Sequence, residues 1–512
     1  MSISKVNSVG LMGIDGFMVN VQTDISNGYP GFEIIGLPDT AIKEAKDRVK
    51  TAIKNSGFRF PPKRITTNLA PASQKKEGTA FDLPVAVSVL EASEQLFMKD
   101  SKTAAFIGEL SLDGTVNSIS GVLPMVISAY KGGIKNIFVP AENADEAAVV
   151  DGINIYPVSK LTDICRHFNS DSPIAPHKVE LSKMFSGKIK TTLDFADVKG
   201  QENVKRALEI AAAGNHNILL IGSPGTGKTM LAQRMPTILP DMTFEEALEV
   251  TKVHSIAGVL PKNTPIISSR PFRSPHHTVS SVSLSGGGSI PRPGELSLAH
   301  NGILFLDELP EFKREALEVL RQPLEDGVVT ISRVNATLTY PCNIMLIASM
   351  NPCKCGYFGD PKHECRCTPG SIAKYRSRVS GPLLDRIDLQ VEVPAVEYDK
   401  LSSVSKGETS EVIKKRVNTA REIQRERYKK YNILSNSQLT AGMMDKFCSL
   451  GEAENMLLKN AFEKLGFSAR AHSRILKVAR TIADLDGQEK INTSHIAEAI
   501  QYRSLDKKFF NN

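Results

Sequence analysis

The stretch Asn217-Ile-Leu-Leu-Ile-Gly-Ser-Pro-Gly-Thr-Gly-Lys-Thr229 decides how the central part of this chain folds. Its first five residues form an apolar run typical of a buried strand. The other eight match the P-loop pattern, a glycine-rich turn between a strand and a helix. Glycines in such a turn let backbone N–H groups point at phosphate oxygens, and the following helix presents its positive N-terminal end to the same anion. We therefore expect a nucleoside triphosphate site.

The P-loop residues have separate expected roles. Lys228 is expected to reach the β- and γ-phosphates, and the hydroxyl of Thr229 to hold Mg²⁺. The alternative is a plain glycine-rich turn, but that alternative does not require the flanking strand and helix that the sequence predicts. The residues predicted to cradle the nucleotide are Gly222, Ser223, Pro224, Gly225, Thr226, Gly227, Lys228 and Thr229.

A second motif supports the first independently. The run Gly302-Ile-Leu-Phe-Leu-Asp-Glu308 is an apolar strand that ends in two carboxylates. Asp307 suits a water-mediated contact with Mg²⁺, and Glu308 suits a base that orients or activates the attacking water. Two adjacent acids also occur at the start of an ordinary solvated loop. After a P-loop at this distance, we favour nucleotide hydrolysis.

Length and charge set the bounds of the interpretation. With 512 residues the chain is too long for one ordinary core, so roughly two to four domains are expected. The net charge of +7 permits nucleic-acid binding but does not require it. No stretch approaches the ~20 consecutive apolar residues that span a bilayer, and the N-terminus lacks the pattern of a secretory signal. We therefore expect a cytoplasmic protein with no membrane partner.

Periodicity predicts two α/β regions followed by a helical region. Predicted strands are Phe17–Val21, Phe32–Ile35, Ile137–Val139, Asn217–Ile221, Gly302–Leu306 and Ile344–Ala348. Predicted helices are Thr40–Lys54, Pro84–Gln95, Val412–Tyr428, Glu452–Leu465 and Ala469–Ala483. The stretch from Asn169 to Lys190 has little periodicity and is predicted to be a linker.

Further motifs resemble an AAA+ module. They are Phe195-Ala-Asp-Val-Lys-Gly-Gln201, the P-loop, LFLDEL, Asn351 after IMLIASM, and Leu383-Leu-Asp-Arg-Ile-Asp388. Two long stretches, Ser269–Gly288 and Gly294–Phe312, closely resemble the YifB/ComM family of magnesium-chelatase-like AAA+ ATPases, which are related to the MCM helicases. The similarity covers nearly the whole chain.

The resemblance implies an α/β fold class with a domain order. It implies a Lon-proteolytic-domain-like α/β domain at 1–170, a linker at 171–192 and an AAA+ P-loop α/β core at 193–397. The core carries a CxC…CxC insertion at 353–367, and a C-terminal helical lid resembling that of magnesium chelatase follows at 398–512.

The same resemblance implies roles for three further side chains. Asn351 would be the sensor that positions water against the γ-phosphate. Arg386 would be an arginine finger offered to the ATP of a neighbouring subunit. Arg470 is the best candidate for the second sensor, with Arg474 one helical turn later as the alternative. Each arginine is otherwise an ordinary surface charge. Because a finger acts across an interface, the assignment implies a ring, expected to be a homo-hexamer.

The N-terminal region resembles the Lon proteolytic domain but lacks its two catalytic side chains. Aligning Glu77-Gly-Thr-Ala80 with the serine motif places Ala80 at the nucleophile, and counting back from Gly133 places Leu123 at the lysine. Neither side chain acts as a nucleophile or a base. Ser73 and the lysines at 75 and 76 lie nearby without a catalytic role in this alignment. We therefore expect a non-proteolytic domain used in assembly or partner binding.

Four of the seven cysteines form two CxC pairs, and clustering of this kind points to a metal rather than to disulfides. The intervening segment contains Gly, Pro and Asp, so the chain is able to fold back and bring the pairs together. We expect a structural Zn²⁺ site. An iron–sulfur cluster, a redox switch and metal-free thiols remain alternatives, and His363 is a possible substitute ligand. The expected ligands are Cys353, Cys355, Cys365 and Cys367.

A predicted β-hairpin after Asp326 has Arg333 at its tip, between Ser332 and Asn335. An arginine there is often merely solvated. The related MCM helicases place a lysine hairpin that grips DNA at the corresponding position, so we expect Arg333 to contact DNA phosphates largely independently of base sequence. The segment Ser255–Gly294, which includes Arg270, Arg273, His276 and His277, is a further candidate for gripping a polymer. The basic helix around Lys414–Arg427 has interleaved acids and is predicted to be solvated.

The favoured function is a ring-forming ATP hydrolase that translocates on DNA. The family resemblance implies branch migration or helicase activity on single-stranded or branched DNA in natural transformation or recombination. The alternative is an ATPase that remodels a protein partner, as the magnesium chelatase motor does. An ATP-dependent protease is disfavoured by Ala80 and Leu123.

Overall fold

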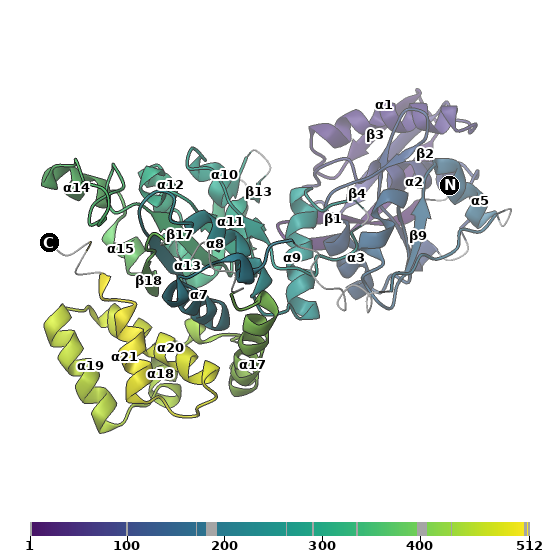
Figure 1. The fold of residues 1–512 in the computed structure, drawn as a ribbon. Coiled ribbons are helices and arrows are strands. Elements are labelled where there is room, and N and C mark those ends of the chain that lie inside the picture. The colour runs from purple at the N-terminus through teal and green to yellow at the C-terminus, as the bar shows by residue number, and fades with distance from the viewer. Residues whose placement is uncertain are drawn as a thin grey trace. The chain divides into compact units, whose positions relative to one another are not determined.

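The computed structural model describes residues 3–98, 101–169, 172–180, 192–262, 264–288, 291–333, 336–396, 407–431, 433–505 and 509. The chain divides into two compact units (Figure 1). The first consists of Met1–Gly187, Phe244–Ser268 and Ser332–Tyr340. The second consists of Lys188–Thr243, Ser269–Ile331 and Pro341–Asn512.

The first unit is built on a seven-stranded mixed sheet with the order β3-β4-β2-β1-β5-β8-β9. β1 and β2, and β2 and β4, are antiparallel, whereas β5, β8 and β9 continue from β1 in parallel. The strand bounds are β1 Ser4–Met12, β2 Asp15–Ser26, β3 Gly31–Ile35, β4 Arg64–Ala70, β5 Ala104–Phe106, β8 Asn136–Pro140 and β9 Asn154–Val158.

Alternating side chains of this sheet enter two separate cores. Val6, Phe106 and Phe138 pack with helices α1 (Thr40–Asn55), α2 (Asp82–Ala92) and α5 (Leu161–Phe168). Their neighbours Val9, Ala105 and Ile137 pack with α3 (Val122–Lys131) and α4 (Ala144–Ala147). Because successive strand residues face opposite sides, both faces of the sheet are covered by helices. The strands and helices predicted for this region are confirmed.

A helix from the middle of the chain belongs to the first unit. α9 (Phe244–Ala257) packs on α3, and the N–H of Gly121 donates to the carbonyl of Ser255 at 3.1 Å. Buried Glu146 accepts hydrogen bonds from the Ser255 hydroxyl and from the N–H of Leu123. Burial raises the pKa of Glu146. The sequence placed this helix inside a continuous ATPase core, but periodicity does not reveal against which sheet a helix packs.

The second unit contains a five-stranded parallel sheet with the order β11-β14-β17-β10-β18. The three central strands are buried along their whole length, as expected for a parallel sheet covered on both faces. These strands confirm the predicted apolar runs. The strand bounds are β10 Ile218–Ile221, β11 Phe272–Arg273, β14 Ile303–Leu306, β17 Met345–Met350 and β18 Leu389–Glu392.

Helices α7 (Glu202–Gly214) and α8 (Lys228–Arg234) flank this sheet, and a C-terminal helical group follows it (Figure 1). Packing of α20 and α17 on α7 joins the helical group to the sheet through one continuous core. Arg427 and Arg480 both pair with buried Asp484 inside the group. The bounds are α17 Ser410–Tyr428, α18 Ala441–Phe447, α19 Glu452–Leu465, α20 Ala469–Leu485 and α21 Thr493–Gln501.

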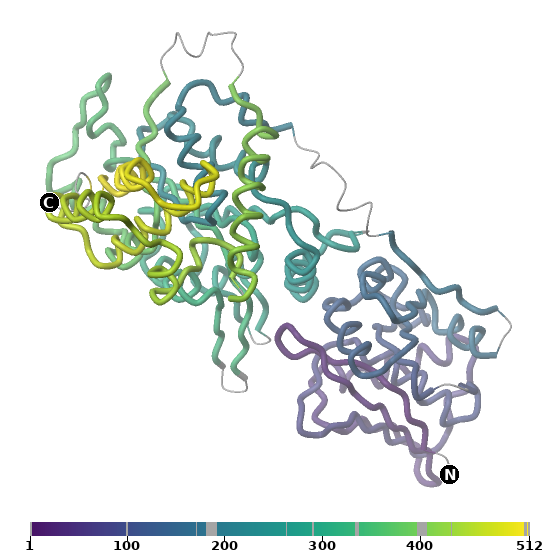
Figure 2. Tube along the Cα trace, turned by 90° about the horizontal axis from the view of Figure 1, so that it is seen from below, coloured from purple at the N-terminus to yellow at the C-terminus, as the bar shows by residue number. Residues whose placement is uncertain are grey.

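The other strands and α-helices of the described residues are short. They are β6 Glu109–Leu110, β7 Val116–Asn117, α10 Ser281–Ser285, β12 Gly286–Gly287, β13 Arg292–Pro293, α11 Glu295–Leu298, α12 Arg314–Glu318, α13 Arg321–Asp326, β15 Val328–Arg333, β16 Ala336–Pro341, α14 Pro369–Arg376 and α15 Gly381–Leu384. β15 and β16 pair with each other and lie side by side in Figure 2. Part of the predicted linker continues the first unit, because the N–H of His177 donates to the carbonyl of Ile155 at 2.8 Å.

Candidate nucleotide site and cysteine cluster

The P-loop connects β10 to α8, as its sequence predicts. The ammonium of Lys228 donates to the carbonyls of Gly222 at 2.7 Å and Ser223 at 3.0 Å, and to the side-chain oxygen of Asn351 at 3.1 Å. Burial lowers the pKa of Lys228. The loop is thus curled around its own lysine, and β17 delivers Asn351 to the same point because β17 lies next to β10.

The magnesium-ligand candidates also meet. The hydroxyl of Thr229 donates to Asp307 Oδ2 at 2.7 Å, joining the start of α8 to the end of β14. The other oxygen of Asp307 accepts a hydrogen bond from Ser349. Ser349 was not predicted, although a polar residue inside the apolar run of β17 was a signal for it. Hydroxyl and carboxylate oxygens are the donors that Mg²⁺ prefers, so this pair fits a magnesium ion.

Glu308 has a left-handed backbone, with φ of 55°, and its side chain is 56% exposed. Its N–H donates to Asp307 at 3.1 Å and to Ser349 at 3.3 Å, and these bonds hold the unusual conformation. His277 Nδ1 lies 3.7 Å from a carboxylate oxygen of Glu308. His277 was singled out in a polymer-gripping segment, whereas the structure places it beside the candidate base.

Gln201 is a second residue whose role the sequence did not reveal. It lies in the left-handed region, with φ of 58°, just before α7. Its side-chain amide donates to the carbonyls of Thr226 and Pro394, both at 2.9 Å. The amide therefore ties the P-loop to the segment that follows β18. The AAA+-like motif that ends at Gln201 was the only signal for this contact.

The four clustered cysteines lie together, with their Sγ atoms all within 4.8 Å of one another. The Sγ–Sγ distances are 3.4 Å for Cys353–Cys355 and 3.7 Å for both Cys353–Cys365 and Cys355–Cys365. Four thiolates around one zinc at about 2.3 Å lie about 3.8 Å apart, so the cluster has the dimensions of a tetrahedral zinc site. A backbone hydrogen bond from Tyr357 lowers the pKa of Cys355, whereas burial and the neighbouring thiols raise the pKa values of Cys365 and Cys367.

Three family models together match most of the chain. They are "Subunit ChlI of Mg-chelatase" at residues 21–143, "Magnesium chelatase, subunit ChlI" at 194–401 and "Magnesium chelatase, subunit ChlI C-terminal" at 407–503. The competence protein ComM of Haemophilus influenzae is 45% identical over 509 residues, which cover 99% of this chain and 98% of that protein. The YifB protein of Escherichia coli is 44% identical with the same coverage. The chain belongs to the ComM/YifB family of magnesium-chelatase-like proteins.

This family membership and the geometry at the ends of β10, β14 and β17 together indicate an AAA+-like ATPase. The 38 kDa subunit of the magnesium chelatase of Rhodobacter capsulatus is a more distant relative. It is 25% identical over 181 residues, or 32% of this chain and 52% of that subunit. No helix in the described part of the chain is long and apolar enough to cross a membrane.

The predicted arginines of this ComM/YifB chain differ in their surroundings. Arg386 is buried, forms an ion pair with Glu325, and donates to the carbonyls of Arg321 at 3.1 Å and Pro382 at 2.6 Å. Arg470 is 61% exposed and lies 3.4 Å from Asp385. Both arginines are paired with a carboxylate, but Arg470 is exposed to solvent whereas Arg386 is buried against Glu325.

Arg474 is part of a buried network. It pairs with Asp388, which also faces His216 Nδ1 at 3.2 Å. Although burial opposes ionisation, the charge of Arg474 and the bond from His216 hold the pKa of Asp388 well below its ordinary value. This network joins α20 to the start of β18. The side chain of Arg474 is therefore occupied by a buried ion pair within the fold, and Arg470 remains the candidate second sensor.

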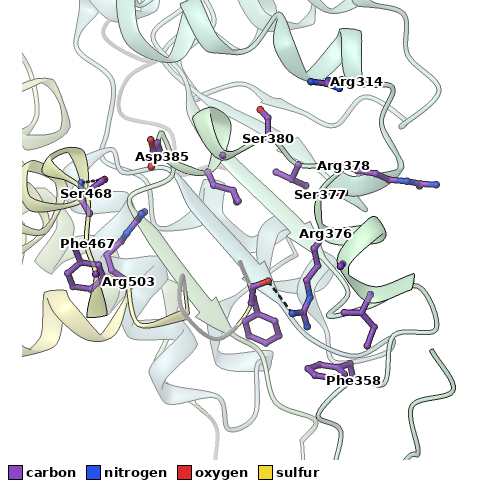
Figure 3. Close-up of a pocket in the computed structure, with 18 of the residues that line it drawn as sticks. Arg314, Phe358, Arg376, Ser377, Arg378, Ser380, Asp385, Phe467, Ser468 and Arg503 are labelled. Carbon is purple, nitrogen blue, oxygen red and sulfur yellow. Dashed lines mark hydrogen bonds between the residues drawn. The ribbon is translucent and has the colours of Figure 1, made fainter. Parts of the chain in front are cut away.

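A cavity of about 900 Å³ opens in the second unit between α14, α15 and the start of α20 (Figure 3). Its lining is rich in arginine and includes Arg314, Arg376, Arg378 and Arg503. Arg376 donates to the carbonyls of Pro352 and Phe509 and lies over the rings of Phe358 and Phe509. None of the P-loop residues lines this cavity.

The predicted hairpin exists, and Arg333 is the last residue of β15. The tip at 334–335 and the side chain of Arg333 lie outside the described residues, so DNA contact there stays a prediction.

Ala80 and Leu123, which the sequence comparison aligned with the catalytic pair of the Lon domain, carry no reactive group. Both are buried, with 6% and 0% of their surface exposed, and Ala80 belongs to an apolar core. Nearby Lys76 is also buried, and its ammonium donates to the carbonyl of Pro71. Burial lowers the pKa of Lys76. A buried methyl group and a buried isobutyl group provide neither nucleophile nor base.

Proposed function

We propose that this chain is an ATP hydrolase that forms a ring, expected to be a homo-hexamer, and couples hydrolysis to movement along DNA. The activity would be branch migration or helicase action in natural transformation or recombination. The observation that carries the hydrolase is the meeting of Lys228, Thr229, Asp307 and Asn351 at one edge of a parallel sheet. The full-length similarity to a protein named for competence supports DNA as the client.

The proposed reaction is in-line attack of water on the γ-phosphate. Lys228 would neutralise the phosphates, and its bond to Asn351 would be exchanged for bonds to ATP. Glu308 would orient the attacking water or accept its proton, with the amide of Asn351 beside it. Thr229 and Asp307 would hold Mg²⁺, which neutralises charge on the phosphates when bound.

Two arginines would complete the site. Arg386 would act on the ATP of the adjacent subunit once released from Glu325, and Arg470 would act as the second sensor. An arginine that leaves an ion pair to reach a neighbouring nucleotide links ring assembly to hydrolysis. Such a finger requires an oligomer, and this requirement supports the ring.

The cysteine cluster is proposed to bind Zn²⁺ in a structural role. The separations of the four sulfurs support zinc over a disulfide, which joins two sulfurs at about 2.05 Å. Elemental analysis of the purified chain tests this directly. We expect about one zinc per chain, and a preparation with iron or without metal contradicts the assignment.

The DNA function is tested by steady-state ATP hydrolysis with and without single-stranded and branched DNA, over a range of salt. We expect DNA to stimulate hydrolysis several-fold and salt to weaken binding, because phosphate contacts release counterions. Arg333→Ala should abolish stimulation while leaving basal hydrolysis intact. Arg166→Ala, which removes an exposed arginine from α5, is the matched control and should behave as wild type.

If DNA neither stimulates hydrolysis nor binds in a salt-sensitive way, a protein-remodelling ATPase replaces this function. The Glu308→Gln variant tests ATP hydrolysis independently of whether DNA or a protein is the partner. It should bind ATP and arrest hydrolysis, whereas Glu315→Gln, which changes an exposed residue of α12, should hydrolyse ATP normally.

A further inference from the structure

The loop that carries the four cysteines touches the P-loop at Gly356. A Cβ added to Gly356 would lie 2.5 Å from Cδ and 2.7 Å from Cγ of Pro224, closer than real side chains approach. Gly356 also has a φ of +88°, and its N–H donates to the carbonyl of Cys353 at 3.0 Å. Glycine is therefore required here for two independent reasons, and the first CxC turn lies in direct contact with the P-loop.

Asp360 makes a second contact between the two loops. One of its oxygens accepts the N–H groups of Lys362 at 2.8 Å and His363 at 3.1 Å, and these bonds shape the turn between the cysteine pairs. The other oxygen accepts the hydroxyl of Ser223 at 2.7 Å. The side chain of Asp360 is only 8% exposed. One carboxylate thus organises the cysteine loop and holds a P-loop side chain.

Ser223 passes this contact on to the nucleotide-binding groups. Its carbonyl accepts the ammonium of Lys228 at 3.0 Å and the hydroxyl of Thr226 at 2.9 Å. A displacement of Ser223 therefore moves the carbonyl oxygen that accepts hydrogen bonds from Lys228 and Thr226. The cysteine loop also follows Asn351 directly, and Asn351 contacts Lys228 from the other side.

The cysteine loop has few apolar contacts of its own. Cys353 is buried, but the residues from 357 to 371 are mostly exposed. A loop without an apolar core depends on its metal for order, because the metal replaces the missing core. Occupation of the four sulfurs should consequently set the positions of Gly356 and Asp360.

We propose that the cysteine loop is a metal-dependent brace of the P-loop, in which bound metal holds Gly356 and Asp360 against Pro224 and Ser223 and so keeps the P-loop in its ATP-binding shape. Asp360 is then a positioning residue for nucleotide binding. The inference rests on the proposed nucleotide and zinc sites and adds their coupling. Because coupling between two sites is reciprocal, ATP must strengthen metal binding by the factor by which metal strengthens ATP binding.

The first experiment measures both directions of this coupling on the full chain. The Kd for MgATP is measured on the zinc-loaded protein and after zinc removal by a chelator. Zinc affinity is measured by competition with a chromogenic chelator, with and without saturating ATP. We expect zinc removal to raise the Kd for ATP about tenfold and ATP to raise zinc affinity by the same factor. Changes below twofold in both directions overturn the brace.

The second experiment is a double-mutant cycle on the zinc-loaded chain. Asp360→Ala and Ser223→Ala should each weaken ATP binding about five- to tenfold while zinc content stays that of the wild type. The double variant should be no weaker than either single variant, because both changes break one hydrogen bond. Glu364→Ala removes an exposed carboxylate from the same loop and should leave ATP affinity unchanged.

Additive losses in the cycle, or ATP affinity within twofold of wild type in both single variants, overturn the inference. If Asp360→Ala loses zinc, Ser223→Ala decides the question, because its cysteine loop is intact. Because the contact of Gly356 with Pro224 remains in that variant, its ATP affinity must then depend on zinc less strongly than that of the wild type.

Failure of the proposed function looks different from failure of the brace. A wild-type chain that binds no ATP or no metal contradicts the proposed function. A zinc-loaded chain that binds ATP with an affinity indifferent to zinc and to Asp360 contradicts the brace alone.

Discussion

The two units are both layered α/β structures, yet their sheets are used in opposite ways. In the second unit three neighbouring parallel strands end at one edge, and that edge gathers Lys228, Asp307 and Asn351. In the first unit the residues that the sequence comparison aligned with a protease's catalytic pair lie off the sheet. Ala80 is in the turn before α2 and Leu123 is in α3, and both are buried and carry no reactive group.

The difference shows what a sheet needs to become an active site. The polar side chains at this edge of the second unit pair with one another: Lys228 donates to Asn351, and Thr229 donates to Asp307. In the first unit Ala80 and Leu123 instead bury apolar side chains, which contribute to packing but not to chemistry. A fold therefore supplies positions, and the side chains at those positions supply the function.

The largest expected effect tests the reactive edge. Lys228→Ala should reduce ATP hydrolysis about 100- to 1,000-fold, because it removes the charge that stabilises the transferring phosphate. Steady-state phosphate release measures the loss. Lys459→Ala removes an exposed lysine from α19 and should hydrolyse ATP normally. Residual hydrolysis above a tenth of wild type in Lys228→Ala contradicts the site.

The next effect tests the inert positions of the first unit. Leu123 is fully buried, so Leu123→Ala should lower the free energy of unfolding by about 2–5 kcal/mol. Leu112→Ala is the matched control, because Leu112 is 54% exposed, and it should change stability little. Urea unfolding of the full chain gives both values. Equal stability of the two variants shows that Leu123 does not lie in a packed core.

The smallest effect concerns a charge inside the first unit. Burial raises the pKa of Asp82 to about 6, against the opposing bond and charge of Arg48. Since the native state holds this proton more tightly than the unfolded chain, the stability that Asp82 contributes is present below about pH 4 and is lost as pH rises through 6. The advantage of Asp82→Asn over wild type should therefore grow by about 2–3 kcal/mol from pH 4 to pH 7.

Asp113→Asn serves as a control, because the contribution of Asp113 to stability changes with pH in the opposite direction. Hydrogen bonds from Thr115 lower the pKa of exposed Asp113, so its contribution is present at neutral pH and is lost as the pH falls. Urea titrations at several pH values measure both variants against the wild type. A stability difference between Asp82→Asn and wild type that is constant from pH 4 to pH 7 contradicts the raised pKa.

Local patterns identified the second unit well because its signals are local. A buried parallel strand is a continuous apolar run, and a P-loop is a short motif with its own geometry, so β10, β14, β17 and α8 were all predicted. The four sulfurs were also predicted to meet, since the turn between the CxC pairs is short. The long helices α17, α19 and α20 were recognised from their period.

Contacts between distant segments were not predictable in the same way. Ser349 reaches Asp307, Gln201 reaches Thr226 and Asp360 reaches Ser223 across 25 to 137 residues of chain. The burial of Arg386 against Glu325 likewise depends on how α13 and α15 pack.

By itself the sequence determined the phosphate-binding turn, the strands that flank it and the cysteine pairs, because each is a property of neighbouring residues. Only the tertiary structure decided that α9 belongs to the first unit, that Asp360 accepts a hydrogen bond from the P-loop and that Gly356 contacts it. Those outcomes depend on which surfaces bury one another, and a pattern along one strand or helix does not carry that information.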